Sequence, residues 1–388
     1  MKYDVIIIGA GPGGIFAAYE LMKKKPDCKI AVFEEGYPLE KRKCPIDGEK
    51  VKSCINCKRC SIMCGFGGAG AFSDGKYNIT NDFGGTLFEY IGKKQAVELM
   101  KYVDEINMEN GGEGTKLYST AGTKFKKLCL QNKLNLLDAS VRHLGTDINY
   151  VVLQNLYDQM KDKMDFFFDA PVETIEITDG GYRIVCENGA YECKKCVVSV
   201  GRSGSKWMEK VCKDLAIPTK SNRSDSYRKY AHCPRIFLYG IQSCSRSSSV
   251  RCEKITAGSS TRTPISTRFD LVRGRRSTEK RIEEGLVTPT ISATPGDLSL
   301  VLPKRIMDGI IEMIYALDKV APGTANDDTL LYGVEVKFYN MEVEIDKNLE
   351  SCYKGLYVIG DGSGVTHSLS HASASGVYVA RHIISEEE

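Results

Sequence analysis

Runs of apolar residues and their spacing divide the first part of the chain into a strand, a helix and a second strand. The apolar run Tyr3–Ile8 leads into a glycine-rich turn, the helical pattern of Ile15–Lys25 follows, and a second apolar run covers Lys29–Phe33. Short apolar runs bounded by glycine are typical of buried strands. This β-α-β order predicts the opening of a doubly wound parallel sheet and therefore an α/β fold.

The middle of the chain changes from helical to extended patterns. Polar helices are predicted over 87–110, 123–137 and 149–163. Short segments rich in β-branched and aromatic residues then alternate with glycine turns, which predicts an antiparallel meander. Its four expected strands are 172–178, 182–187, 190–193 and 196–200.

The pattern in the last third of the chain predicts that its final segments belong to the same domain as the first residues. A helix is expected over 303–320, an extended segment over 334–345, a buried strand over 355–359 and a final helix over 372–384. We therefore expect a Rossmann-like domain assembled from both chain ends around a smaller α+β second domain. The expected parts are 1–200, with a cysteine- and glycine-rich insertion at 44–85, then 201–330, then 331–388.

One segment, 221–267, departs from these patterns. It contains eleven Ser and carries a formal charge of +6, from six Arg and two Lys against one Asp and one Glu. Its apolar residues show little periodicity, which is typical of a solvated linker. A basic patch for nucleic acid is a second interpretation. A third hypothesis is that residues 224–267 result from a shifted reading frame or a deletion.

Composition and charge narrow the class of protein. The chain has 388 residues, 42% hydrophobic and 27% charged, with a net charge of +3. This small charge argues against nucleic acid as the main partner, and no apolar run reaches the roughly 18–20 residues of a membrane span. Because the first strand begins at residue 3, we expect no signal peptide and a cytoplasmic location. Fifteen cysteines then indicate metal or redox chemistry before a disulfide framework.

The glycine-rich turn has the spacing of a dinucleotide fingerprint, G-x-G-x-x-G. Gly9 permits the tight turn, Gly11 lets the backbone approach a pyrophosphate, and Gly14 lets the helix pack against the strand. Gly13 lies inside the same turn, where the helix N-terminus attracts phosphate. Glu34 follows the second strand, where a carboxylate accepts hydrogen bonds from ribose hydroxyls. These features together predict dinucleotide binding.

A second glycine turn, Gly360-Asp361-Gly362, follows the apolar run near the other end of the chain. An ordinary strand–turn–helix connection with a capping aspartate would look the same. A protein that binds only NAD needs no such contribution from the far end of the chain, whereas the longer FAD molecule does. The pair of turns therefore favours FAD.

A cysteine quartet, Cys54, Cys57, Cys60 and Cys64, has the spacing C-x2-C-x2-C-x3-C. Three thiolates at this spacing favour a [4Fe–4S] cluster. The fourth ligand is either Cys64 or Cys44, which precedes a proline. Structural zinc and redox-active thiols are the alternatives. A cluster would accept electrons singly from a flavin.

The segment Gly65–Lys76 follows the quartet and is dominated by small residues. Small residues at this density let the backbone approach a flat ring closely, and the alternative is a flexible glycine loop. Within this segment Gly68 and Asp74 are candidate cofactor contacts. Outside it, Arg42 is a further candidate.

With Arg142–Asp147, Val200–Gly204, Gly274–Thr278, Glu335–Tyr339 and Leu356–His371, these motifs resemble FAD-dependent dehydrogenases of the glutathione-reductase-like flavoprotein superfamily. The resemblance implies that Glu34 binds the adenosine ribose and Asp361 the ribityl chain. It also implies that His143 and His367 face the flavin, as an acid or base or as structural histidines. It names no substrate.

The expected function is therefore an FAD-dependent oxidoreductase. Electrons would pass between an unknown small-molecule substrate, or a transient NAD(P)H donor, and the iron–sulfur cluster or a redox partner protein. Two other functions remain open. One is a flavin-dependent enzyme that modifies nucleic acid through the basic region 221–276, and the other is a zinc-stabilised NAD-binding protein.

Overall fold

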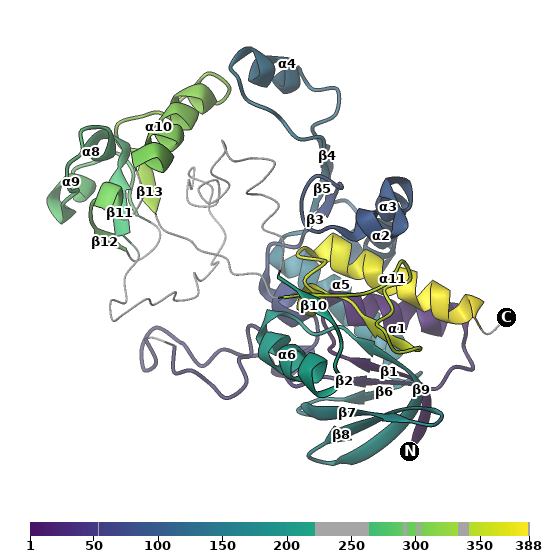
Figure 1. The fold of residues 1–388 in the computed structure, drawn as a ribbon. Coiled ribbons are helices and arrows are strands. Elements are labelled where there is room, and N and C mark those ends of the chain that lie inside the picture. Colours follow the sequence, from purple (N-terminus) through teal and green to yellow (C-terminus); the bar gives the residue numbers. More distant parts are fainter. Residues whose placement is uncertain (53, 222–263, 290–292, 301–303, 333–340, 387–388) are drawn as a thin grey trace. The chain divides into compact units, whose positions relative to one another are not determined.

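The structure is a computed structural model that describes residues 1–52, 54–221, 264–289, 293–300, 304–332 and 341–386 (Figure 1). Most of the Ser/Arg-rich segment 221–267 lies outside the described residues, so its three interpretations stay hypotheses. Its last residues form strand β11 (Pro264–Thr267).

The chain divides into two compact units. Unit 1 consists of Met1–Ser119, Asp138–Asn222 and Tyr339–Glu388, and unit 2 of Thr120–Leu137 and Arg223–Phe338. Unit 1 thus contains both ends of the chain. The predicted domain boundaries at residues 200 and 330 stay predictions.

Unit 1 opens with the expected parallel β-α-β arrangement. Strand β1 (Lys2–Ile8) pairs in parallel with β2 (Ile30–Phe33), and helix α1 (Pro12–Lys24) connects them. Val5, Ile6 and Ile7 of β1 are fully buried, as expected for a strand covered on both faces. The predicted α/β fold with a parallel sheet is confirmed.

The main sheet has seven strands, in the order β6-β2-β1-β9-β8-β7, with β15 paired to β9. Strands β7, β8 and β9 form the predicted antiparallel meander, and β9 also pairs in parallel with β1. The strands not yet bounded are β6 (Asp165–Phe167), β7 (Val172–Thr178), β8 (Gly181–Cys186), β9 (Gly189–Val198) and β15 (Leu356–Val358).

Strand β9 corrects the sequence prediction of two strands at 190–193 and 196–200. On one side its first half, up to Cys193, pairs with β8, while Cys196 to Val198 pair with β15. Its other side pairs with β1 along most of its length. Lys194 and Lys195 interrupt the apolar pattern, but they mark a change of partner and not the end of a strand.

Helices and a small sheet complete unit 1. Helix α5 (Gly145–Met160) lies close to the predicted helix 149–163. The predicted helix 87–110 is instead two helices, α2 (Leu87–Ile91) and α3 (Lys93–Asn107), because Gly92 between them has φ +85°. The small sheet joins β3 (Lys76–Ile79), β4 (Leu117–Ser119) and β5 (Ser140–His143), and a two-stranded ladder pairs β10 (Thr219–Lys220) with β14 (Glu342–Val343).

Unit 2 has hydrophobic clusters of its own. One surrounds helix α10 (Lys304–Asp318) and includes Ile310 and Ile314, and another includes Ile265 and Leu330. Its other elements are α4 (Lys124–Gln131), α8 (Arg268–Val272), α9 (Glu279–Glu283), β12 (Thr294–Pro295) and β13 (Leu330–Tyr332). Among the described helices of both units, none is long and apolar enough to cross a membrane.

Helix α11 (Leu369–Ser385) packs directly on α1 in unit 1. Small residues allow this contact, since a Cβ atom on Gly376 would lie 2.1 Å from the Gly13 carbonyl oxygen and 2.9 Å from the Ala17 nitrogen. Helix α11 therefore packs closely against α1, whose N-terminus follows the glycine fingerprint.

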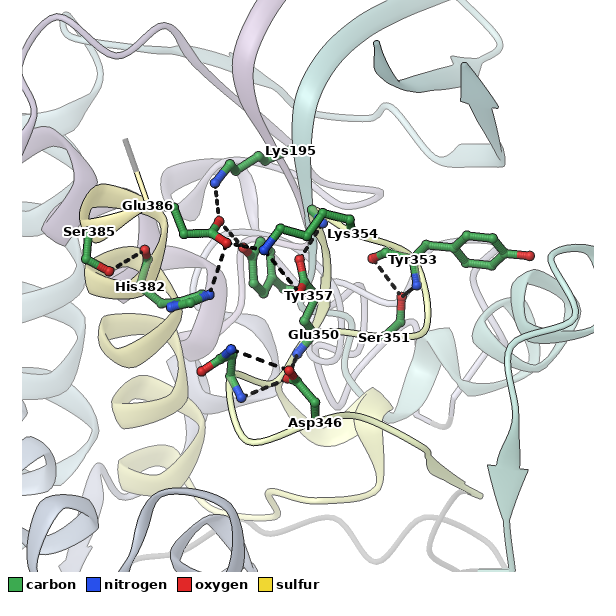
Figure 2. Close-up of polar contacts among 12 residues, drawn as sticks. Lys195, Asp346, Glu350, Ser351, Tyr353, Lys354, Tyr357, His382, Ser385 and Glu386 are labelled. Atoms are coloured by element: carbon green, nitrogen blue, oxygen red, sulfur yellow. Dashed lines mark hydrogen bonds and ion pairs between the residues drawn. The ribbon is translucent and has the colours of Figure 1, made fainter. Parts of the chain in front are cut away.

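The end of α11 is fixed by an ion cluster (Figure 2). Lys195 of β9 and Lys354 both pair with the Glu386 carboxylate, and the Tyr357 hydroxyl donates to it at 3.1 Å. Although partial burial opposes ionisation, the hydrogen bonds from the two lysines lower the pKa of Glu386 to about 2. The cluster joins the C-terminal helix to β9 and β15.

Candidate functional site

The fingerprint turn adopts the conformation that its glycines predict. Gly9 has φ +101°, and a Cβ on it would lie 2.6 Å from the Ser199 carbonyl oxygen. A Cβ on Gly14 would lie 2.0 Å from the Gly9 oxygen, so the helix packs tightly on the turn. Around Gly11, by contrast, a Cβ would meet no described atom within 4 Å. The backbone at Gly11 is therefore open to a ligand.

The N-terminus of α1 is suited to an anion. Gly11 is the N-cap residue, and within the described chain no side chain caps this end. The first turn contains Pro12, Gly13, Gly14 and Ile15 and thus no acidic group. Its backbone N–H groups and the positive end of the helix dipole favour a phosphate.

Glu34 lies where the spacing predicts, directly after β2, and its carboxylate is buried. Oε2 accepts from the Ala10 amide at 2.8 Å, and Oε1 accepts from the Gly36 and Gly65 amides at 2.9 and 2.8 Å. Burial raises the pKa of Glu34, while these three donors act in the opposite direction. Glu34 therefore ties the fingerprint to the glycine-rich loop, and its contact with a ribose stays a prediction.

The second glycine turn follows β15, and it also lies at the carboxyl end of the sheet. Gly360 has φ +73°, and Asp361 begins a short 3-10 turn. The Asp361 Oδ1 atom lies 2.8 Å from His367 Nδ1, and Oδ2 lies 2.9 Å from Arg202 Nε. His367 therefore lies beside Asp361. Its predicted role as an acid or base stays a prediction.

Ser199 lies between the two glycine turns. A Cβ on Gly13 would lie 2.6 Å from the Ser199 Oγ atom, and a Cβ on Gly360 would lie 3.3 Å from it. This hydroxyl is buried and has no hydrogen-bond partner among the described residues. Buried polar groups are rarely left unpaired, so an unpaired hydroxyl here is consistent with a ligand that is absent from the structure.

Sequence reasoning did not identify Ser199 or Arg202 as site residues. Both directly follow β9, in the segment Ser199–Arg202. The signal that would have found them is the meeting of parallel strands at one sheet edge, since β1, β9 and β15 are neighbours. The sequence prediction treated β9 as the end of a meander and so did not use this signal.

The glycine-rich loop after the quartet contacts the fingerprint. The Gly67 amide donates to the Ala10 oxygen at 2.8 Å, and a Cβ on Gly68 would lie 3.2 Å from the Gly11 Cα. The predicted candidates Gly68 and Gly11 are therefore adjacent in space.

Arg42 binds the backbone of this loop through hydrogen bonds. Its guanidinium is buried and donates to four backbone oxygens, those of Ser61, Ile62, Phe66 and Gly68, at 2.6–2.9 Å. Burial lowers the pKa of Arg42 to about 10, although the nearby Glu34 opposes this shift. Arg42 fixes the loop that carries Gly68, and a direct contact with a cofactor stays a prediction.

The cysteine quartet does not form a metal site in the described structure. Cys54 and Cys57 are exposed, Cys60 is half-buried and Cys64 is buried. Among the described residues, no three histidine, cysteine or carboxylate side chains are arranged to hold a metal ion. The predicted [4Fe–4S] cluster and its ligands, with Cys44 as the alternative fourth ligand, therefore stay predictions.

Cys64 has a different partner. Its thiol donates to Glu35 Oε1 at 2.8 Å. Burial, and then this hydrogen bond, raise the pKa of the Cys64 thiol to about 12.

Two other candidates lie on the small sheet. Asp74 forms an ion pair with Lys76 at 2.7 Å. His143 is exposed at the end of β5, opposite Lys76 in the register of β3 and β5. The roles predicted for both residues stay predictions.

Comparison with known proteins gives one family match, at the N-terminus. Residues 1–38 match the Thi4 family, and this range contains β1, α1, β2 and Glu34. A protein of Clostridium beijerinckii, described only as uncharacterised, is 24% identical over 449 residues, covering 99% of this chain and 81% of the relative. The aligned region exceeds the 388 residues of this chain, so the relative contains segments without a counterpart here.

Among solved structures, the chain is similar to several oxidoreductases. E. coli quinol fumarate reductase has a TM-score of 0.46 at 13% identity, covering 99% of this chain and 70% of that one. Glycine oxidase from Geobacillus kaustophilus has a TM-score of 0.42 at 12% identity, covering 99% of this chain and 95% of that one. L-amino acid deaminase from Proteus myxofaciens has a TM-score of 0.42 at 11% identity, covering 99% of this chain and 90% of that one. At these values the likenesses do not assign an activity to this chain.

Proposed function

We propose that this protein is an FAD-dependent oxidoreductase. One observation carries the proposal: the carboxyl edge of the sheet brings together glycine turns from opposite ends of the chain, with Ser199 in contact with both. A dinucleotide as long as FAD needs contacts along such an edge. The fingerprint match of residues 1–38 falls on one of these two turns.

The residues present fit an FAD molecule along this edge. The open backbone at Gly11 and the uncapped start of α1 would hold the pyrophosphate, and Glu34 would lie near the adenosine ribose. Asp361 would accept hydrogen bonds from the ribityl hydroxyls. The glycine-rich loop that contains Gly68 would lie beside the flavin end. When bound, FAD supplies two-electron hydride chemistry, and the chain orients it and excludes water.

The test is purification of the full chain followed by an absorption spectrum and FAD titration. We expect flavin absorption bands, or binding of added FAD to one site per chain. A Gly11→Val variant places a side chain in the open position, and it should weaken FAD binding at least about tenfold without unfolding the protein. A colourless protein with no affinity for FAD would overturn the proposal.

The iron–sulfur cluster predicted for the cysteine quartet is a separate part of the proposal. Iron and sulfide analysis of the same preparation tests the quartet separately. Stoichiometric iron that is lost in a Cys57→Ala variant would show that the loop rearranges around a cluster. Flavin without iron would leave the FAD proposal intact. An NAD(P)H donor is tested by adding NADH or NADPH anaerobically and following loss of the flavin bands.

A further inference from the structure

Three segments meet at the Asp361 carboxylate. Arg202 comes from the turn after β9, Asp361 from the turn after β15, and His367 from the connection to α11. Each carboxylate oxygen has one of these partners, at 2.9 Å for Arg202 and 2.8 Å for His367. Because an ionised carboxylate only accepts, His367 Nδ1 must carry the hydrogen in this contact.

We infer that Arg202 and His367 are positioning residues for the flavin, acting through Asp361. The inference rests on the proposed FAD function. The two partners fix the rotation of the Asp361 side chain. A carboxylate has about four acceptor positions, so one aspartate can accept from several donors at once, ribityl hydroxyls included. A fixed, charged acceptor binds such hydroxyls more strongly than a mobile or neutral one.

The surroundings of the turn support this role. Gly360 and Gly364, which bound the turn Asp361–Ser363, both have positive φ, a conformation that favours glycine. The side chains of Asp361 and His367 are 24% and 21% exposed, whereas that of Arg202 is 50% exposed. Asp361 and His367 are thus largely shielded, whereas Arg202 is half-exposed.

A competing explanation is that Arg202 binds a phosphate of FAD directly. The two explanations differ in a double-mutant cycle. If Arg202 acts through Asp361, Arg202→Gln should weaken FAD binding about tenfold in the wild-type background and have no further effect in an Asp361→Asn background. Direct phosphate binding would give the same loss in both backgrounds.

The experiment measures FAD dissociation constants by quenching of flavin fluorescence in the full chain. Arg202→Lys, which keeps the charge, should recover most of the affinity. His367→Asn, which keeps a donor near the Nδ1 position, should bind FAD more tightly than His367→Leu. Arg183→Gln is the matched control, since Arg183 forms an ion pair with Glu176 and is also 50% exposed.

ADP serves as a second probe, because it contains the pyrophosphate and adenosine but no ribityl chain. The dissociation constant for ADP should stay within about twofold in Arg202→Gln. Equal weakening of ADP and FAD would overturn the inference, as would wild-type FAD affinity in Arg202→Gln or additive losses in the cycle. Failure of the wild-type protein to bind FAD would instead overturn the proposed function.

Discussion

Two carboxylates at the sheet edge, Glu34 and Asp361, are held in different ways. Glu34 is buried and accepts from three backbone amides of the described chain, so it fixes the local backbone. Asp361 accepts from two side chains and is partly exposed. The first carboxylate therefore stabilises the local backbone, whereas the second is held by side chains from two other segments of the site.

A Glu34→Gln substitution tests the structural role of the first carboxylate. The amide NH₂ group of glutamine would face a backbone N–H donor, leaving it unpaired. We expect the free energy of unfolding to fall by about 2 kcal/mol, measured by urea denaturation without FAD. Glu176→Gln, at an exposed position of β7, is the control and should change the free energy of unfolding by less than about 0.5 kcal/mol. An unchanged stability of Glu34→Gln would show that the three amide contacts are not formed.

For single residues, the sequence predicted where the site residues lie relative to the strands, but not which groups they contact. The spacing placed Glu34 and Asp361 correctly after their strands, because short apolar runs fix where a strand ends. It did not predict the Gly65 amide on Glu34 or Arg202 on Asp361. Those contacts depend on loops whose conformation is set by tertiary packing and not by local pattern.

At the scale of elements, the contact between α1 and α11 determines how the two chain ends meet. It is made of small residues, and Gly376 lies against the backbone at Gly13. The strand patterns that formed the α/β prediction were strong, whereas this helix contact has no signature in periodicity. The split of the predicted helix 87–110 at Gly92 was missed for a related reason, because only the observed φ of +85° shows that the helix stops there.

A Gly376→Ala substitution should destabilise this contact. Its methyl group would lie about 2 Å from a backbone oxygen, so the helices must separate. We expect a loss of about 2 kcal/mol in the free energy of unfolding, measured by urea denaturation. The matched control is Gly309→Ala in α10, where a Cβ would meet nothing within 4 Å among the described atoms. That variant should be unchanged or stabilised by up to about 1 kcal/mol.

The anchor at the end of α11 predicts a pH dependence. The pKa of Glu386 is lowered from 4.5 to about 2 in the folded protein, so its stabilising effect is complete above pH 4.5 and is lost as the pH falls toward 2. A Glu386→Gln variant should therefore be less stable than wild type at pH 7, by about 1 kcal/mol after allowance for solvent screening.

Urea denaturation at several pH values measures this effect. The difference between wild type and Glu386→Gln should shrink as the pH is lowered from 5 toward 3. A difference that stays constant with pH would mean that the lysine contacts do not stabilise the folded state. Lys195→Met removes one of the two lysines that pair with Glu386. It should lower the free energy of unfolding at pH 7 by less than Glu386→Gln does.

At the scale of the whole molecule, unit 1 and unit 2 have separate hydrophobic clusters. The proposed FAD site lies entirely in unit 1. The sequence predicted a domain formed from both ends because the two glycine turns lie at opposite termini. Its bounds for the second domain, 201–330, stay a prediction, since the Ser/Arg-rich segment has no usable periodicity.

Calorimetry tests this division. We expect two thermal transitions in the ligand-free protein, with saturating FAD raising the midpoint of only one of them. At a hundredfold excess over the dissociation constant, binding contributes about 2.7 kcal/mol, or a shift of about 5–10 °C for a unit of this size. A single transition that shifts as a whole would show that the two units unfold together.

Strand β9 has one more consequence, for how the protein is made. β1, at residues 2–8, needs β9 as its neighbour, and the second half of β9 needs β15, at residues 356–358. A ribosome releases the N-terminal strand long before the last partner has been synthesised. The nascent chain must therefore keep an apolar, unpaired sheet edge from aggregating until translation is nearly complete.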